Sequence, residues 1–253
     1  MRIFTTSDIH IDHKENREWL LNLSSYDYTN DMLILGGDVS DLTEHLVLSF
    51  ETLRSIFKQV CFVPGNHDLW LLRNNKDDSL SYFNELLQVA SDYGIETKPV
   101  CIDSLAIVPL FSWYDYTFGP LTQELKMIWM DFKACKWPEA YENMNDLTDY
   151  FLSLNNESIQ AIIPSKFKTI ITFSHFMPRI DIMPEYIPEK RRKIYPVLGS
   201  CRLDEQIKQI GSTIHIYGHS HFNLHKKIEN TTYINNAFGY PYESYISSKE
   251  LLC

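Results

Sequence analysis

The sequence lacks the features that mark disulfide-rich, zinc-knuckle and membrane proteins. Its five cysteines are odd in number, widely spaced and never arranged as CxxC, so neither a disulfide framework nor a zinc knuckle is indicated. We expect most of them to be buried as small apolar side chains. No run of 18 apolar residues argues for a membrane span, and the opening MRIFTTSD turns polar too early for a signal peptide. We therefore expect a soluble, cytoplasmic protein with no membrane partner.

Positive charge is also scarce, because 23 Lys and Arg stand against 33 Asp and Glu, for a formal net charge of -10. A surface dominated by carboxylates repels the nucleic-acid backbone, so tight binding of long DNA or RNA is disfavoured. Small phosphorylated substrates remain compatible with this charge, since a pair of divalent cations reverses the local sign. The sequence gives no indication of the oligomeric state.

Five short polar motifs each follow an apolar run of the kind that forms β-strands. In chain order they are Asp8-Ile9-His10, GDVSD at 37–41, GNHD at 65–68, Ser174-His175 and GHSH at 218–221. In the third motif Gly65 has no Cβ, which lets the chain bend sharply after its strand. Open α/β sheets place their ligands at the carboxyl ends of strands, so we expect the five motifs to meet in one site.

Strand and helix signals alternate along the first 93 residues, as in parallel βαβ units. A capping box, with Asp41 as N-cap and Glu44 at N3, predicts the start of the second helix. The strand signals cover residues 2–6, 32–35, 60–63, 105–110, 169–173, 213–217, 222–228 and 231–234, and the main helix signals cover 42–57, 79–93 and 202–210. With 44% hydrophobic residues, the chain can bury the core of a single domain over 1–253.

The middle of the chain departs from this alternation. Residues 111–166 are interpreted as a helical insertion or cap of two helices, split near Pro138 because a proline discourages helix at the residue before it. The aromatic loop 111–118 is either a packed corner or a base-stacking platform. Residues 176–200 contain four prolines and form an irregular loop, whose basic run 190–193 is either a solvated charge cluster or a phosphate contact.

Taken in order, DxH, GDxxD, GNH[DE], H and GHxH resemble the motifs of the calcineurin-like metallophosphoesterases, over most of the chain. The resemblance implies two mixed β-sheets packed face to face and flanked by helices, a four-layer α/β/β/α sandwich. It also implies two metal ions with a bridging water or hydroxide. One ion would be bound by Asp8, His10 and His221, the second by Asn66, His175 and His219, and both by Asp38. Such Asp, His and Asn ligands suit divalent or trivalent Mn, Fe or Zn. In an extended 219–221 segment both imidazoles would point to one side.

The same resemblance makes His67 the general acid that protonates the leaving group, a role suited to imidazole. Asp41 would orient that imidazole, or would serve only as the helix N-cap, or both. Asp68 is interpreted as a turn residue or as a partner supporting the ligands. The other histidines match no motif and are expected in surface or core roles: His13, His45, His215 and His225.

The predicted function is hydrolysis of a small phosphomonoester or phosphodiester, with nucleotides and cyclic nucleotides among the candidates, through attack of a metal-bridging hydroxide. A protein phosphatase is an alternative that is weakened by Leu42, because those relatives carry arginine after the second Asp of GDxxD. A nuclease is disfavoured by the acidic balance. The alternative outside catalysis is an interaction module that binds a partner through loop 111–118.

Overall fold

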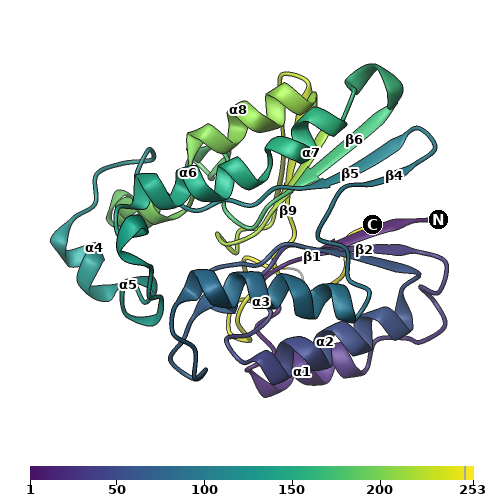
Figure 1. Ribbon diagram of the computed structural model, residues 1–253, viewed down its shortest axis with the longest axis horizontal. Helices are drawn as coiled ribbons and strands as arrows, with labels where there is room; N and C mark the ends of the chain where they lie inside the picture. The colour runs from purple at the N-terminus through teal and green to yellow at the C-terminus, as the bar shows by residue number, and fades with distance from the viewer. Residues whose placement is uncertain (248) are drawn as a thin grey trace.

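Two β-sheets form the centre of the computed structural model, which describes residues 1–247 and 249–253 (Figure 1). The smaller sheet has the order β1-β2-β3, all parallel, with strands β1 (Ile3–Thr6), β2 (Met32–Leu35) and β3 (Gln59–Phe62). The larger has the order β4-β5-β6-β7-β9-β8. Its strands are β4 (Val100–Ile102), β5 (Leu105–Pro109), β6 (Thr169–Phe173), β7 (Ile214–Tyr217), β8 (Leu224–Ile228) and β9 (Thr231–Asn235). Only its edge strands β4 and β8 pair antiparallel.

Apolar side chains from both sheets share one core between them. Met32 and Ile34 of β2 belong to the same buried cluster as Ile107, Phe173 and Ile216 of the larger sheet. Because β2 lies inside the sandwich, its apolar run MLIL is continuous, as in parallel strands that are covered on both faces. The face-to-face packing predicted from the motifs is confirmed, although the smaller sheet is parallel throughout rather than mixed.

Helices cover the two outer faces. On the smaller sheet lie α1 (Lys14–Leu21), α2 (Thr43–Ile56) and α3 (Ser79–Asp92), and on the larger lie α6 (Met144–Leu154), α7 (Asn156–Ala161) and α8 (Cys201–Ile210) (Figure 1). The bounds of the eight predicted strands and the helices at 79–92 and 201–210 agree with the sequence prediction to within two residues, whereas β4 was not predicted. The four-layer α/β/β/α architecture is therefore confirmed.

The predicted cap of α2 is wrong. The helix starts at Thr43 with Leu42 in the N-cap position, and no side chain caps it. The carboxylate of Asp41 instead accepts a hydrogen bond from Arg73 Nε at 2.8 Å. Arg73 contacts both oxygens of the Asp41 carboxylate, and this two-point ion pair holds Asp41 away from the start of the helix.

The segment 111–166 holds more pieces than the two predicted helices. Its α-helices are α4 (Gln123–Ile128), α5 (Asp131–Ala134), α6 and α7, with 3₁₀ turns at η2 (Glu139–Tyr141) and η3 (Pro164–Lys166). One extra break falls at Asn155, between α6 and α7. The other falls at Trp129, whose extended backbone ends α4 and lets Asp131 turn inward. In Figure 1, α4 and α5 project to the left, beyond the carboxyl ends of the strands.

The aromatic loop 111–118 packs into the protein, whereas most of the cysteines are not buried. Trp113 and Tyr114 are buried against Phe176, which favours the packed-corner interpretation of loop 111–118. All five cysteines are free, but only Cys61 is buried and three are exposed, so the prediction that most are buried is wrong. The exposed ones lie on an edge strand, at the start of a helix and at the end of the chain.

No helix among the described residues combines the length and the hydropathy needed to cross a bilayer.

Candidate metal centre

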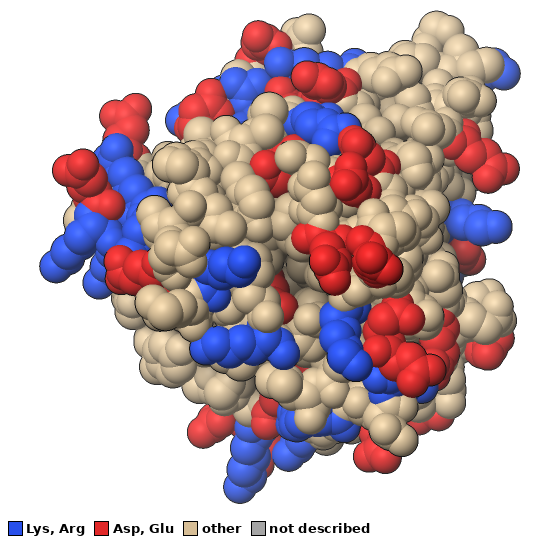
Figure 2. All heavy atoms as spheres, turned by 60° about the vertical axis from the view of Figure 1, so that its left-hand side comes forward, with Lys and Arg blue, Asp and Glu red and all other residues tan. Residues whose placement is uncertain are grey.

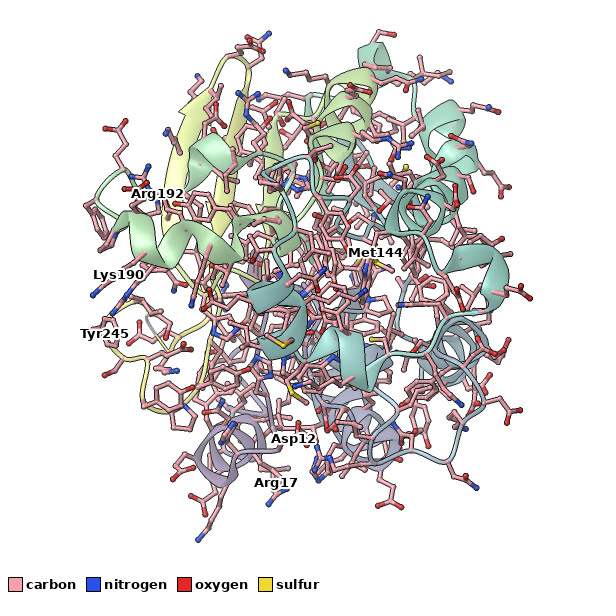
Figure 3. The ribbon with its side chains drawn as sticks, turned by 90° about the vertical axis from the view of Figure 1, so that its left-hand side faces the viewer. Asp12, Arg17, Met144, Lys190, Arg192 and Tyr245 are labelled. Carbon is pink, nitrogen blue, oxygen red and sulfur yellow. The ribbon has the colours of Figure 1, made fainter. Side chains whose placement is uncertain are left out.

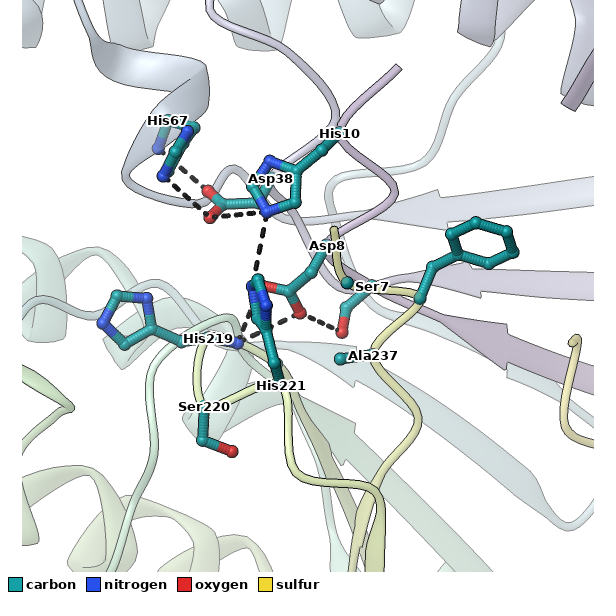
Figure 4. A network of polar contacts seen from close by, with 12 residues as sticks. Ser7, Asp8, His10, Asp38, His67, His219, Ser220, His221 and Ala237 are labelled. Carbon is teal, nitrogen blue, oxygen red and sulfur yellow. Dashed lines mark hydrogen bonds and ion pairs between the residues drawn. The ribbon is translucent and has the colours of Figure 1, made fainter. Parts of the chain in front are cut away.

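The motif residues meet where β1, β2, β3, β6 and β7 end (Figure 4). Their ligand atoms form three overlapping groups, each within 4.8 Å, and each able to hold a metal ion: Asp8 with His10 and His221, His10 with Asp38 and His67, and Asp38 with His175 and His219. Asn66 joins the last group, because its Oδ1 lies 3.0 Å from His175 Nε2. The structure thus brings all seven predicted ligands and His67 together.

Asp38 lies between the two sides of this centre. On one side, His10 Nε2 lies 3.3 Å from His221 Nε2 and 3.9 Å from Asp38 Oδ2. On the other side, His175 Nε2 lies 3.4 Å from Asp38 Oδ1 and 3.1 Å from His219 Nδ1. One carboxylate therefore offers an oxygen to each group, which is the arrangement that a bridging ligand requires.

The outward ring nitrogens of three histidines are fixed by acceptors. His175 Nδ1 lies 2.8 Å from the carbonyl of Gly36, and His219 Nε2 lies 3.0 Å from that of Val197. His221 Nδ1 lies 2.6 Å from a carboxylate oxygen of Glu243. A ring nitrogen that donates outward leaves a lone pair on the inward nitrogen. The inward lone pairs of His175 and His219 then face each other beside the side-chain oxygen of Asn66. These three donors together fit a metal ion.

Burial controls the protonation of these groups. It lowers the pKa of His175 and His219 to about 4, which keeps both imidazoles neutral and able to ligate. Burial also acts to lower the pKa of His221, but the carboxylates of Asp8 and Glu243 raise it to about 9. A proton on His221 thus balances two carboxylates, and a metal ion would supply the same positive charge.

Five of the seven predicted ligands have a left-handed backbone. The φ angles are 52° at Asp8, 38° at His10, 54° at Asp38, 65° at His219 and 57° at His221. Non-glycine residues rarely adopt this conformation, and where they do the surroundings must hold it. The prediction that residues 219–221 are extended is therefore wrong. The backbone there is fixed instead by the Asp8 carboxylate, which accepts a hydrogen bond from the backbone N–H of His219 at 3.0 Å.

Gly65 and Asp68 of the third motif have structural tasks. A Cβ on Gly65 would lie 2.7 Å from both the backbone nitrogen of Asp38 and a ring carbon of His175, so only glycine fits between these ligands. The fully buried carboxylate of Asp68 accepts four backbone N–H bonds, from Asp38, Val39 and Gly65 at 2.8 Å and from Ser40 at 3.1 Å. Asp68 therefore joins the second and third motifs, as the interpretation of it as a supporting residue implies.

His67 lies at the edge of the centre. Its ring stacks on Trp70 with a centroid distance of 3.6 Å, and its Nε2 lies 3.9 Å from Asp38 Oδ2 and 3.5 Å from the Tyr240 hydroxyl. Burial holds its pKa well below the usual range. Within the described part of the chain no hydrogen bond joins Asp41 to His67, because Arg73 occupies the Asp41 carboxylate. Trp70, rather than Asp41, fixes the plane of the ring.

Two acidic residues that support the centre match no sequence motif. Glu243, near the end of the chain, accepts from His221. Asp131 accepts from the Asn66 amide and from the indoles of Trp70 and Trp129, each at 2.8 Å. Neither has a local signal, since the predicted ligand that each supports lies at least 22 residues away in sequence.

A cavity of about 540 Å³ adjoins the centre. Its walls are largely apolar and aromatic, with Trp70, Trp129, Met183, Ile187 and Tyr240 among them, and its mouth includes Lys190, Arg191 and Lys193. The volume is that of a ligand site rather than of a packing defect.

A four-layer sandwich whose strand ends gather carboxylates, imidazoles and a carboxamide defines a metal-dependent phosphoesterase. Residues 1–223 match the family described as calcineurin-like phosphoesterase, and the chain belongs to that family. The predicted enzyme class, a hydrolase of phosphoric esters, is thereby confirmed. The family depends on a dinuclear metal centre, and the clusters described above are able to hold metal.

One curated relative is the acyl-carrier-protein phosphodiesterase PptH of Mycobacterium tuberculosis (strain ATCC 25618 / H37Rv). It is 34% identical over 131 residues, which are 47% of this chain and 39% of the relative, so the match spans well under half of that protein's length. The crystal structure of phosphopantetheinyl hydrolase (PptH) from Mycobacterium tuberculosis superposes with a TM-score of 0.81 at 20% identity, over 94% of this chain and 89% of that one. This second likeness shows a shared fold.

Proposed function

We propose that this protein is a dinuclear metal-dependent phosphodiesterase whose substrate carries a long organic arm, with a phosphopantetheine arm on a carrier protein as the leading candidate. The observation that carries the proposal is the cavity of about 540 Å³ that adjoins the metal centre. A phosphate alone needs far less room, and apolar and aromatic walls suit an organic arm better than they suit water. The names given to the similar protein PptH, an acyl-carrier-protein phosphodiesterase and a phosphopantetheinyl hydrolase, support the choice of arm.

In this proposal the seven predicted ligands hold two ions. Asp8, His10 and His221 would hold one, Asn66, His175 and His219 would hold the other, and Asp38 would serve both. The absence of a thiolate and the mixture of oxygen and nitrogen donors suit Mn, Fe or Zn. When bound, such ions lower the pKa of water and neutralise charge on the phosphoryl oxygens.

The chain's own residues would position the substrate and move the proton. His67 lies on the open side of the centre, where the cavity lies, and we propose that it donates a proton to the leaving oxygen of the ester once the negative charge of the bound phosphate has raised its burial-lowered pKa. The stack on Trp70 holds the ring, and the Tyr240 hydroxyl at 3.5 Å gives its Nε2 a second partner. Trp129 and Tyr240 line the same cavity and would exclude water from the reacting face once the arm is bound.

A nucleotide or cyclic nucleotide is the second candidate substrate. It is favoured by the aromatic rings beside the centre, since Tyr240 stacks on His10 at a centroid distance of 4.5 Å and Trp129 lines the same cavity. Aromatic side chains stack on nucleobases of any sequence.

The test is a substrate screen with metal-loaded protein. We would incubate it with a holo-acyl-carrier protein, bis(p-nitrophenyl) phosphate, p-nitrophenyl phosphate and cyclic nucleotides, and follow the carrier by intact-protein mass spectrometry. The proposal predicts release of the arm, lost on chelation and reduced about 10²- to 10⁴-fold in His67→Ala. Cleavage of nucleotides with the carrier intact would favour the second candidate. Failure to cleave any diester would overturn the proposal.

A further inference from the structure

We infer that the mouth of the cavity is a docking surface for an acidic protein that carries the phosphodiester on an exposed arm. This inference rests on the proposed function and names the partner through which the substrate arrives. The surface has two parts. The cationic rim is Lys190 and Arg191 of η5 (Glu189–Val197), and the apolar shoulder is Met127, Ile128 and Met130 at the end of α4.

The two cations of the rim have no anionic partner. Both are exposed and line the cavity mouth, and neither forms an ion pair or a side-chain hydrogen bond with another residue in the described ranges 1–247 and 249–253. The next two cations along the chain, by contrast, contact other residues. Lys193 pairs with Glu124 at 2.5 Å, and Arg192 donates to the backbone carbonyls of residues 187 and 185. In a protein with a net charge of -10, two uncompensated cations at a site entrance attract a negatively charged partner.

The shoulder exposes apolar surface beside these cations. The exposed fractions of the side chains are 64% at Met127, 50% at Ile128 and 39% at Met130, and the last two line the same cavity. Apolar patches bordered by polar residues mark interaction sites, and methionine adapts to the shape of a partner. In Figure 2, which brings this side of the molecule forward, Lys and Arg side chains border uncharged surface.

The rim and the shoulder form one surface. The pair between Lys193 of η5 and Glu124 of α4 ties the two elements together. Figure 3 shows Lys190 beside the segment that carries Tyr245, whose ring is 74% exposed and lines the mouth as well. A partner at this mouth therefore meets cations and apolar side chains together.

A small substrate would leave this surface unused. Its phosphate belongs at the metal centre, on the floor of the cavity, whereas the rim and the shoulder face solvent at the entrance. An acidic protein with some apolar surface complements both parts while its arm enters the cavity. Complementary charge acts chiefly on the rate of encounter and falls with salt.

The experiment compares two substrates in two charge-reversed variants. Lys190→Glu/Arg191→Glu changes the rim, and Lys58→Glu/Lys98→Glu makes the same change of charge at exposed positions at the amino end of β3 and before β4, away from the site. With a holo-acyl-carrier protein, the rim variant should raise KM about tenfold or more and lose most of the salt dependence of kcat/KM. With bis(p-nitrophenyl) phosphate, the loss of kcat/KM in the rim variant should be at least several-fold smaller. The control variant should match the wild type on both substrates.

A second measurement changes the partner instead of the enzyme. A carrier whose surface Asp and Glu are replaced by Asn and Gln should show the raised KM with the wild-type enzyme and little further rise with the rim variant. If the wild type cleaves the carrier and the rim variant has the same KM and salt dependence, the docking inference alone is wrong. If the wild type cleaves the aryl diester and leaves the carrier intact, the proposed substrate fails and the inference fails with it.

Discussion

The carboxylate of Asp131 accepts a hydrogen bond from the side-chain amide of Asn66 at 2.8 Å. Asp131 starts α5 in the segment 111–166, whereas Asn66 follows β3. Because the amide nitrogen of Asn66 is bound to Asp131, its oxygen is the atom that faces His175, at 3.0 Å. The segment 111–166 thus orients a predicted metal ligand.

Removing this carboxylate should weaken metal binding at the Asn66 side of the centre. In Asp131→Ala the amide is free to rotate, and partners that orient a ligand are typically worth about 10- to 100-fold in metal affinity. The affinity would be measured by competition with a chromophoric chelator. Tryptophan emission gives a second readout, because the indoles of Trp70 and Trp129 lose the same acceptor.

Two further variants make this result specific. Asp131→Asn keeps one acceptor oxygen but opposes its amide nitrogen to the Trp129 indole N–H, so its effect should be intermediate. Asp146→Ala, at an exposed position in the first turn of α6, should bind metal as the wild type does. Identical binding curves for Asp131→Ala and the wild type would show that Asp131 does not orient the ligand.

Asp68 should be a large contributor to stability. Its buried carboxylate accepts four backbone N–H bonds, and Asp68→Asn would place an amide nitrogen against some of those donors. Unpaired buried donors and lost hydrogen bonds to a charged group each cost about 1 to 3 kcal/mol, so we expect the free energy of unfolding in urea to fall by about 3 kcal/mol or more. Asp77→Asn, exposed and in the segment before α3, should change it little. An equal effect of the two substitutions would contradict this account.

The strands and the motif positions could be predicted because their signals are local. An apolar run ending in Gly65-Asn66-His67 already specifies a buried strand and a turn, and parallel strands bring their carboxyl ends to one edge. The seven candidate ligands follow from the resemblance of the ordered motifs to the family, and the structure brings them together.

What could not be predicted depends on contacts between distant segments. The left-handed backbone of His219 is held by the carboxylate of Asp8, 211 residues away. Asp41 fails as a helix cap because Arg73, 32 residues later, takes its carboxylate. Asp131 likewise meets Asn66 across 65 residues. No window of sequence contains both members of these pairs, and a capping box or an HxH pattern looks the same whether or not a distant partner intervenes.

The ion pair between Arg2 and Asp31 should make stability depend on acid pH. Arg2 Nε lies 2.9 Å from Asp31 Oδ2, and this hydrogen bond holds the pKa of the Asp31 carboxyl below its usual value. A carboxyl whose pKa is lowered by folding stabilises the protein above its unfolded pKa of about 4, and this contribution is lost as the pH falls through the lower folded value. In Arg2→Met the difference in urea midpoint from the wild type should therefore be largest near neutral pH and shrink toward about pH 3.

Lys98→Met removes an exposed cation without an ion pair among the described residues and should show no such convergence. A constant difference between Arg2→Met and the wild type across this pH range would mean that the side chain of Arg2 acts through packing rather than through the Asp31 charge.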